Sequence, residues 1–174
     1  MTWDEIYAER YEEWSAHMTA DIAFYSQLAV QAGGPLVGVA IGNGRVAIPV
    51  AHATGQRVLG IDSSPAMLAQ ARARAAEAGV QLDLREGDMR DLVLDEPAAL
   101  IYCPFRALLH LPTWNDRRRT FERVAASLRP GGRFAWNAFA FDHRLAAEAT
   151  VERLQAEPGD VDEPEPLVPG GPPE

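Results

Sequence analysis

The chain has 174 residues, of which 47% are hydrophobic and 24% charged, a composition that fits one globular domain with a core of its own. No apolar run approaches the ~20 residues of a membrane-spanning helix, and the first residues lack the basic and apolar regions of a secretory signal. The net charge of −9 argues against nucleic acid as a partner, because phosphate binding needs clustered positive charge. We therefore expect a cytoplasmic protein that binds neither membrane nor nucleic acid.

The sequence does not indicate disulfide or metal chemistry. Cys103 is the only cysteine, which excludes an internal disulfide and any site built from several cysteines. The four histidines lack the spacing of metal ligands, so we predict no metal. Cys103 ends an apolar run, and we interpret it as a small core residue.

Two helical patterns fill the first thirty residues. Aromatic and aliphatic residues recur at three- and four-residue spacing over residues 4–31, and Asp21 is placed to cap the second helix. A Gly-Gly-Pro sequence ends this second pattern at residue 33. We assign residues 1–34 to an amino-terminal helical cap.

The stretch from Leu36 to Asp62 predicts a cofactor site. An apolar run, Leu36–Ile41, leads into Gly42-Asn43-Gly44; a stretch of helical spacing follows, and a second run, Val58–Ile61, ends on Asp62. The glycines permit a sharp turn and leave the first amides of the helix uncovered, where an anionic group can bind. Asp62 at the end of the second strand is placed to accept hydrogen bonds from ribose hydroxyls. The pattern indicates a nucleotide-type cofactor.

Strand and helix patterns continue to alternate after this unit. A helix capped within Ser63-Ser64-Pro65 precedes a short strand, Leu82–Glu86, and Pro97–Cys103 reads as a strand buried on both faces. Thr113 is placed to cap the next helix, and a final strand is expected at 134–139. This order predicts an α/β fold: a Rossmann-like, doubly wound, mainly parallel sheet with helices on both faces, over residues 35–141.

The last part of the chain is less patterned. A terminal helix is expected over residues 142–156. Residues 157–174 are rich in proline and acids and cannot form a core, so we expect an extended or disordered tail there.

The glycine turn alone does not identify the nucleotide. Residues 42–47 read Gly-Asn-Gly-Arg-Val-Ala, which fits the dinucleotide pattern G-x-G-x-x-G/A and so allows NAD as well as other adenosine cofactors. Three further features narrow the choice: the two helices before the first strand, Gly87-Asp88-Met89 after the third, and Leu-Arg-Pro-Gly-Gly at 128–132 before the fifth.

With these motifs in this order, the sequence resembles the class I S-adenosylmethionine-dependent methyltransferases over residues 7–139. The resemblance implies S-adenosylmethionine as cofactor, S-adenosylhomocysteine as product and a small molecule as methyl acceptor. It also implies a set of cofactor-binding residues. Gly42, Asn43 and Gly44 form the loop, and Asp62 and Ser63 hold the ribose. Asp88 and Met89 contact the adenine, Tyr11 approaches the methionine end, and Phe105 lines the pocket.

The sequence departs from the family pattern at two places. Gly38 stands where the family usually has an acid, and Ala40 where it usually has a glycine. We expect the missing carboxylate to weaken the hold on the cofactor's ammonium group and Gly38→Glu to tighten binding. The family's sheet also continues past the fifth strand, so an altered or truncated end is expected to leave an exposed edge. We expect the chain either to form a homodimer through this edge or to be only marginally stable, with weak or absent catalysis.

His110 is the candidate catalytic residue. It follows the fourth strand, at the edge of the sheet where ligands bind, and could act as a general base. The alternative is a histidine that packs against or caps the following helix. For the whole chain, two alternatives to a small-molecule methyltransferase remain: a degenerate methyltransferase-like binding or assembly domain, and an NAD-dependent oxidoreductase. The chain contains no lysine, which disfavours the Tyr/Lys chemistry of the latter.

Overall fold

The computed structural model describes residues 6, 8, 10, 11, 13, 15 and 17–138. Those at positions 6 to 15 all have helical backbone, as the sequence pattern predicts. The described residues belong to one compact unit that ends at Ala138. The predicted terminal helix, 142–156, and the predicted tail, 157–174, lie outside the described residues.

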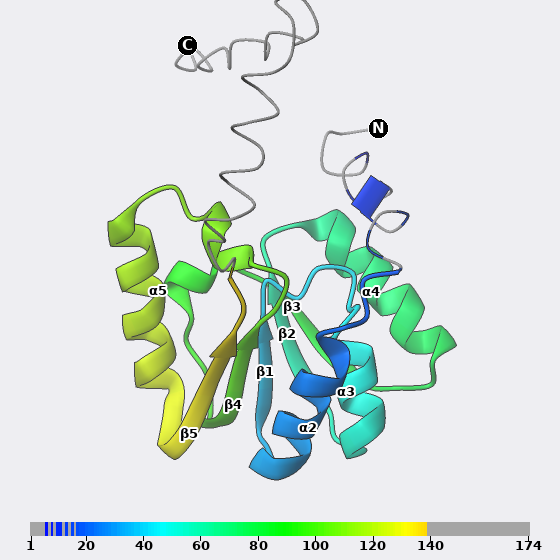
Figure 1. Ribbon diagram of the computed structural model, residues 1–174, viewed down its shortest axis with the longest axis horizontal. Helices are drawn as coiled ribbons and strands as arrows, with labels where there is room; N and C mark the ends of the chain where they lie inside the picture. The colour runs from blue at the N-terminus through cyan, green and yellow to red at the C-terminus, as the bar shows by residue number, and fades with distance from the viewer. Residues whose placement is uncertain are drawn as a thin grey trace, which may run out of the picture. The chain divides into compact units, whose positions relative to one another are not determined.

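A five-stranded parallel sheet is the centre of the fold (Figure 1). Its strands follow the spatial order β3-β2-β1-β4-β5. The chain therefore moves outward from β1 to β3, then returns across β1 to add β4 and β5, and the order reverses between β1 and β4. In such sheets ligands bind beyond the carboxyl ends of the strands at this point of reversal. The strands are β1 (Leu36–Val39), β2 (Val58–Asp62), β3 (Leu82–Glu86), β4 (Ala98–Cys103) and β5 (Leu128–Trp136).

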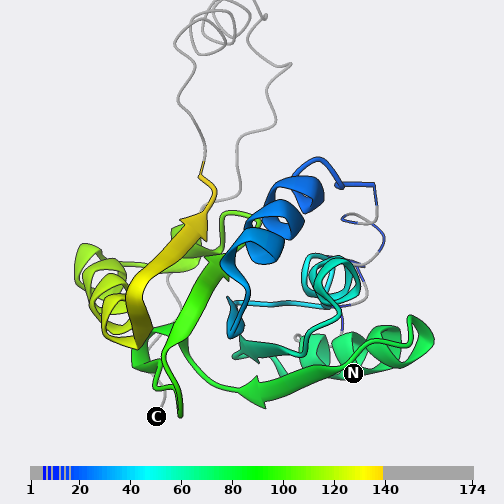
Figure 2. The ribbon, with the colours of Figure 1, turned by 90° about the horizontal axis from the view of Figure 1, so that it is seen from below.

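Helices cover both faces of this sheet (Figure 2). On one face Tyr25, Val50 and Leu68, from three different helices, share a buried cluster with Leu36 of β1. On the other face Val124 packs with Val37 and other strand residues. The first face carries α2 (Ile22–Ala32), α3 (Ala47–Thr54) and α4 (Pro65–Glu77), and the second carries α5 (Trp114–Ser127) with the short 3-10 helices η1 (Met89–Asp91) and η2 (Ala107–His110). The predicted Rossmann-like fold is confirmed.

Two of the three helix caps form as predicted. The Ser64 hydroxyl accepts a hydrogen bond of 3.0 Å from the Met67 amide at the start of α4. Thr113 and Asp116 form a reciprocal capping box at the start of α5. The prediction for Asp21 was wrong: it stands at the cap position of α2 but makes no side-chain capping bond, because its carboxylate binds Arg45 instead.

Two strands differ from the sequence prediction by more than one residue at an end. β1 ends at Val39 because Ala40 has a φ of 50°, which turns the chain out of the sheet. β5 begins at Leu128 rather than at residue 134, because Leu128 already pairs with Ala98, and it ends at Trp136 rather than at residue 139. The next pair is Leu100 with Arg133, so residues 129–132 form a bulge opposite Ala99. The Pro-Gly-Gly sequence thus interrupts a strand that continues on both sides of it.

We expect Ala40→Gly to stabilise the protein. Ala40 occupies the left-handed region that alanine adopts at a cost of about 1 kcal/mol and glycine does not, so the free energy of unfolding should rise by up to that amount. Urea denaturation measures the change. Ala73→Gly, at an exposed position within α4, is the matched control and should lower stability by about 1 kcal/mol. An equal loss of unfolding free energy in both variants would show that Ala40 is not strained.

Candidate cofactor site

The glycine turn at the carboxyl end of β1 forms the floor of the site. Ala40, Gly42 and Gly44 all have φ between 50° and 80°, which coils the chain tightly before α3. Asn43 is fully buried, and its Oδ1 accepts a 3.3 Å hydrogen bond from the Arg45 amide, so this side chain supports the turn from within. The N-cap residue of α3, Val46, provides no side-chain cap, and the helix start therefore suits an anionic group.

Asp62 connects the ends of β1 and β2. Its Oδ2 accepts a hydrogen bond of 2.7 Å from the Gly42 amide, and its Oδ1 accepts one of 2.9 Å from the Ser64 amide. The Asp62 carbonyl in turn accepts from Gly87 at the end of β3. One residue thus fixes the turns that follow three neighbouring strands. Each carboxylate oxygen has two lone pairs, so these bonds leave acceptor capacity for a ligand hydroxyl.

A cavity of about 300 Å³ opens beside Asp62. Its volume lies at the lower end of the range for small-molecule pockets. Asp62, Ser63, Asp88, Met89 and His110, all predicted from the sequence as site residues, lie on its wall. The complete lining is Ala40, Asp62, Ser63, Gly87, Asp88, Met89, Arg90, His110, Leu111 and Pro112.

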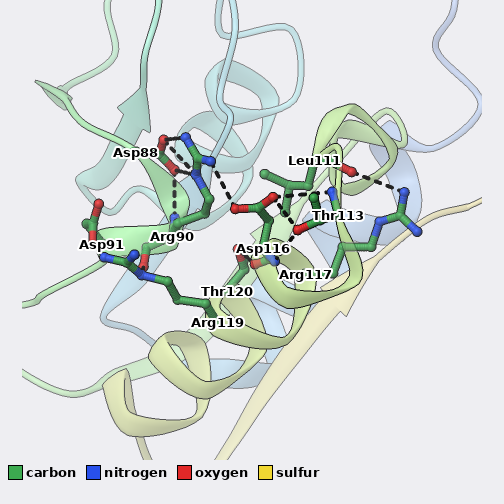
Figure 3. Close-up of polar contacts among 9 residues, drawn as sticks. All are labelled: Asp88, Arg90, Asp91, Leu111, Thr113, Asp116, Arg117, Arg119 and Thr120. Atoms are coloured by element: carbon green, nitrogen blue, oxygen red, sulfur yellow. Dashed lines mark hydrogen bonds and ion pairs between the residues drawn. The ribbon is translucent and has the colours of Figure 1, made fainter.

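An ion-pair network supports the Asp88 side of the cavity (Figure 3). Asp88 caps η1, and its carboxylate accepts hydrogen bonds of 2.8 Å from the Arg90 amide and 3.0 Å from the Arg90 Nε. The Arg90 Nη1 continues to Asp116 of α5, at 3.0 Å. Arg90 holds the pKa of Asp88 below its ordinary value; at Asp116 the Thr113 hydroxyl is the larger cause of a lowered pKa, with Arg90 second. Arg90 and Asp116 lie 26 positions apart, and no local sequence pattern predicts that they pair.

The other predicted cofactor residues meet above the glycine turn. Tyr11 and Phe105 pack edge to face with ring centroids 5.7 Å apart, and a Cβ atom on Gly42 would lie 4.0 Å from the Tyr11 ring. Phe105 is held there by an unusual loop: it and Arg106 both have positive φ, and the Asn137 side chain accepts a 2.9 Å hydrogen bond from the Arg106 amide. Positive φ at two consecutive non-glycine residues marks strain of the kind that gathers at functional sites.

A buried arginine, Arg45, connects the glycine turn to the amino-terminal segment and to Phe105. Arg45 is only 7% exposed, and its guanidinium donates to both carboxylate oxygens of Asp21, at 2.7 and 2.8 Å, and to the Met18 carbonyl. The same guanidinium lies 5.0 Å above the Phe105 ring. Burial alone would lower the Arg45 pKa, but the Asp21 carboxylate outweighs it and the pKa is raised. Arg45 lies in the glycine turn, as its sequence position indicates, but its bonds to Met18 and Asp21, which link the amino-terminal segment to the turn, were not predicted.

The structure changes the expectation for Gly38. A Cβ atom at this position would lie 3.1 Å from the ring and the hydroxyl of Tyr102, closer than ordinary van der Waals contact. Gly38 is buried, and it pairs with Tyr102 across β1 and β4. The expectation that Gly38→Glu tightens binding required open space at this position, and Tyr102 fills that space.

His110 lies on the cavity wall at the end of η2 and is exposed. Its position satisfies the first requirement of the predicted role, which is access to a bound ligand. Within the described residues, no group of three or more His, Cys, Asp or Glu side chains is arranged to hold a metal ion. In the same part of the chain, none of the helices has the length and apolar character needed to cross a bilayer. Cys103 is buried, as expected for a core residue.

Fold and site together define an α/β domain with a cavity at the carboxyl edge of its parallel sheet, and comparison with known proteins identifies its family. Residues 37–132 match the family described as "Methyltransferase domain", which covers more than half of the chain. The chain belongs to this methyltransferase family, and the resemblance seen in the sequence is confirmed.

Individual relatives agree with this assignment. The chain is 31% identical over 156 residues to a 27-O-demethylrifamycin SV methyltransferase of Amycolatopsis mediterranei, covering 88% of this chain and 55% of that protein. It is similar to CalS10 from Micromonospora echinaspora, an amino pentose methyltransferase solved with bound SAM, at 27% identity and a TM-score of 0.64 over 79% of this chain and 58% of that one. It is also similar to the CcbJ methyltransferase of Streptomyces caelestis, at 25% identity and a TM-score of 0.59 over 66% of this chain and 50% of that one. The chain thus spans little more than half the length of these relatives.

We expect Arg90→Gln to remove an acid-sensitive part of the stability. Because Arg90 lowers the pKa of Asp88 in the folded state, the ionised carboxylate contributes stability that is complete above its unfolded pKa, near 3.9, and is lost as the pH falls through the lower folded value. The variant should therefore be less stable than the parent at pH 7, and the two curves should converge below about pH 4. Urea denaturation over a pH series measures this. Arg72→Gln, which removes a bond to the Leu84 carbonyl only, should show a pH-independent difference.

Proposed function

We propose that this protein binds S-adenosylmethionine and transfers its methyl group to a small molecule, releasing S-adenosylhomocysteine. The observation that carries the proposal is the position of Asp62, at the carboxyl end of β2, hydrogen-bonded to the glycine turn and on the wall of the 300 Å³ cavity. Family membership supports the reaction, and the relatives named above are methyltransferases.

Different residues contact different parts of the cofactor. Asp62 and Ser63 accept from the ribose hydroxyls, while Asp88 and Met89 contact the adenine at the far end of the cavity. The start of α3 receives the methionine carboxylate, as expected for an anion at a helix amino terminus. Tyr11 and Phe105 cover the glycine turn and enclose the sulfonium end. Glycines 42 and 44 and buried Asn43 shape the loop between these regions.

A sulfonium donor is already activated, so the main task of the protein is to align the acceptor with the methyl group. His110, on the cavity wall, is the candidate base for an acceptor that must lose a proton. The names of the relatives favour a hydroxyl or an amine of a small natural product or sugar as the acceptor.

One observation favours a second candidate, a methyltransferase-like domain that binds cofactor without catalysis. Glycine stands at position 38 where the family usually has an acid, and a Cβ atom there would lie only 3.1 Å from the ring and hydroxyl of Tyr102. Binding without turnover would favour this candidate. NAD binding in place of S-adenosylhomocysteine binding would favour the oxidoreductase alternative.

We expect Asp62→Ala to weaken the binding of S-adenosylhomocysteine roughly ten- to hundredfold, because loss of a charge-assisted hydrogen-bond partner costs about 1.5 to 3 kcal/mol. Calorimetric titration with S-adenosylhomocysteine and with NAD measures the affinity. Asp83→Ala is the matched control, since Asp83 binds Arg57 and Arg85 on the surface and does not line the cavity. Equal affinity in the parent and in Asp62→Ala would remove Asp62 from the site.

We further propose that two copies of the chain associate through β5. Among the described strands β5 pairs only with β4, and Trp136 near its end is 44% exposed. Light scattering over a concentration series should then show a dimer, and Trp136→Glu should shift it toward monomer. Trp114→Glu, at a 70% exposed tryptophan on α5, should leave the dimer intact. A monomer at every concentration would refute this proposal.

A further inference from the structure

Tyr102 carries a polar group that the site described so far does not use. Its side chain is fully buried in β4, and its hydroxyl has no hydrogen-bond partner among the described residues. Neighbouring Tyr25 differs, since its hydroxyl donates to the Cys103 carbonyl at 3.5 Å. The two rings lie 5.6 Å apart. Burial raises the pKa of Tyr102, so its hydroxyl stays neutral and can both donate and accept.

The position of this hydroxyl is set by Gly38. The two residues pair across β1 and β4, and a Cβ atom on Gly38 would lie 3.1 Å from the Tyr102 hydroxyl oxygen. The tyrosine ring thus occupies the space that any larger residue on β1 would take. Its hydroxyl comes to rest against β1, two residues before the turn at Ala40.

The Tyr102 hydroxyl lies beneath the point between β1 and β4 where the strand order reverses. Asp62 stands on the β2 side of β1, and Tyr102 stands on the β4 side. A nucleoside whose ribose binds Asp62 and whose substituent extends over the glycine turn therefore crosses β1 toward Tyr102. A phenylalanine would fill the same space without burying an unpaired hydroxyl, which costs free energy in the unliganded protein.

We propose that the Tyr102 hydroxyl is a positioning contact for the amino-acid end of the cofactor, reaching its ammonium group directly or through one bridging water. The inference rests on the proposed function. It gives the unpartnered hydroxyl a partner that arrives with the ligand, and it supplies from β4 a polar contact that Gly38 on β1 cannot provide. Since the hydroxyl is neutral, it orients the ammonium group without the full attraction of a carboxylate.

The test compares two ligands and two tyrosines. S-adenosylhomocysteine carries the amino-acid end, and 5′-methylthioadenosine has the same nucleoside and sulfur without it. Calorimetry should show that Tyr102→Phe binds S-adenosylhomocysteine about tenfold more weakly, the effect of one hydrogen bond to a charged group, and binds 5′-methylthioadenosine as the parent does. Without ligand, the thermal midpoint of Tyr102→Phe should equal or exceed that of the parent, because no hydrogen bond is lost.

Tyr25→Phe is the control, because it removes the hydroxyl of the neighbouring ring. It should lower the midpoint of the unliganded protein, since it loses a bond to Cys103, and keep the ratio of the two affinities unchanged. The proposal is overturned if Tyr102→Phe leaves both affinities unchanged or weakens both equally while the parent binds S-adenosylhomocysteine. If the parent binds neither ligand, the proposed function fails and this inference fails with it.

Discussion

The hydrogen bonds of Asp62 to the Gly42 and Ser64 amides hold the carboxyl edge of the sheet together. A tight turn with positive φ at Ala40, Gly42 and Gly44 is costly to keep in one conformation, and Asp62 fixes it from the neighbouring strand. The same carboxylate lies on the wall of the cavity, so the group that orders the turn is the one proposed to hold the ribose. A structural role and the proposed binding role thus depend on one side chain.

Two arginine side chains provide further connections at the carboxyl edge of the sheet. Arg45 joins Asp21 and Met18 of the amino-terminal segment to the glycine turn and to Phe105. Arg90 joins Asp88 beside the cavity to Asp116 at the start of α5. A planar guanidinium can bind two partners in a fixed geometry, which a lysine ammonium cannot do as well, and the chain has arginine at every one of its 16 basic positions. The glycine turn and the Asp88 side of the cavity are therefore each connected by an arginine to residues outside the site.

The sequence predicted what depends on local pattern. Apolar runs, and for β3 the alternation of leucines with polar residues, located the five strands. Ser64 and Thr113 were recognised as caps, and the acid at the end of β2 was placed correctly at the sheet edge. Contacts between distant positions were not predictable in this way. Asp21 has the sequence context of a cap, yet a buried cation 24 positions away binds it more strongly than helix amides would. Likewise, Gly38 suggested a missing carboxylate, and only the pairing of β1 with β4 reveals that a tyrosine from the next strand fills the space.

Tyr11 has a kinetic consequence for the proposed cofactor. Its ring lies over Gly42 and packs against Phe105, and it comes from the segment that Arg45 ties down through Met18 and Asp21. In the proposed function, the methionine end of the cofactor binds next to this ring. For a cofactor bound as proposed, the Arg45–Asp21 ion pair would therefore influence the rates of uptake and release through its position beside Tyr11 and Phe105, although neither side chain lines the cavity.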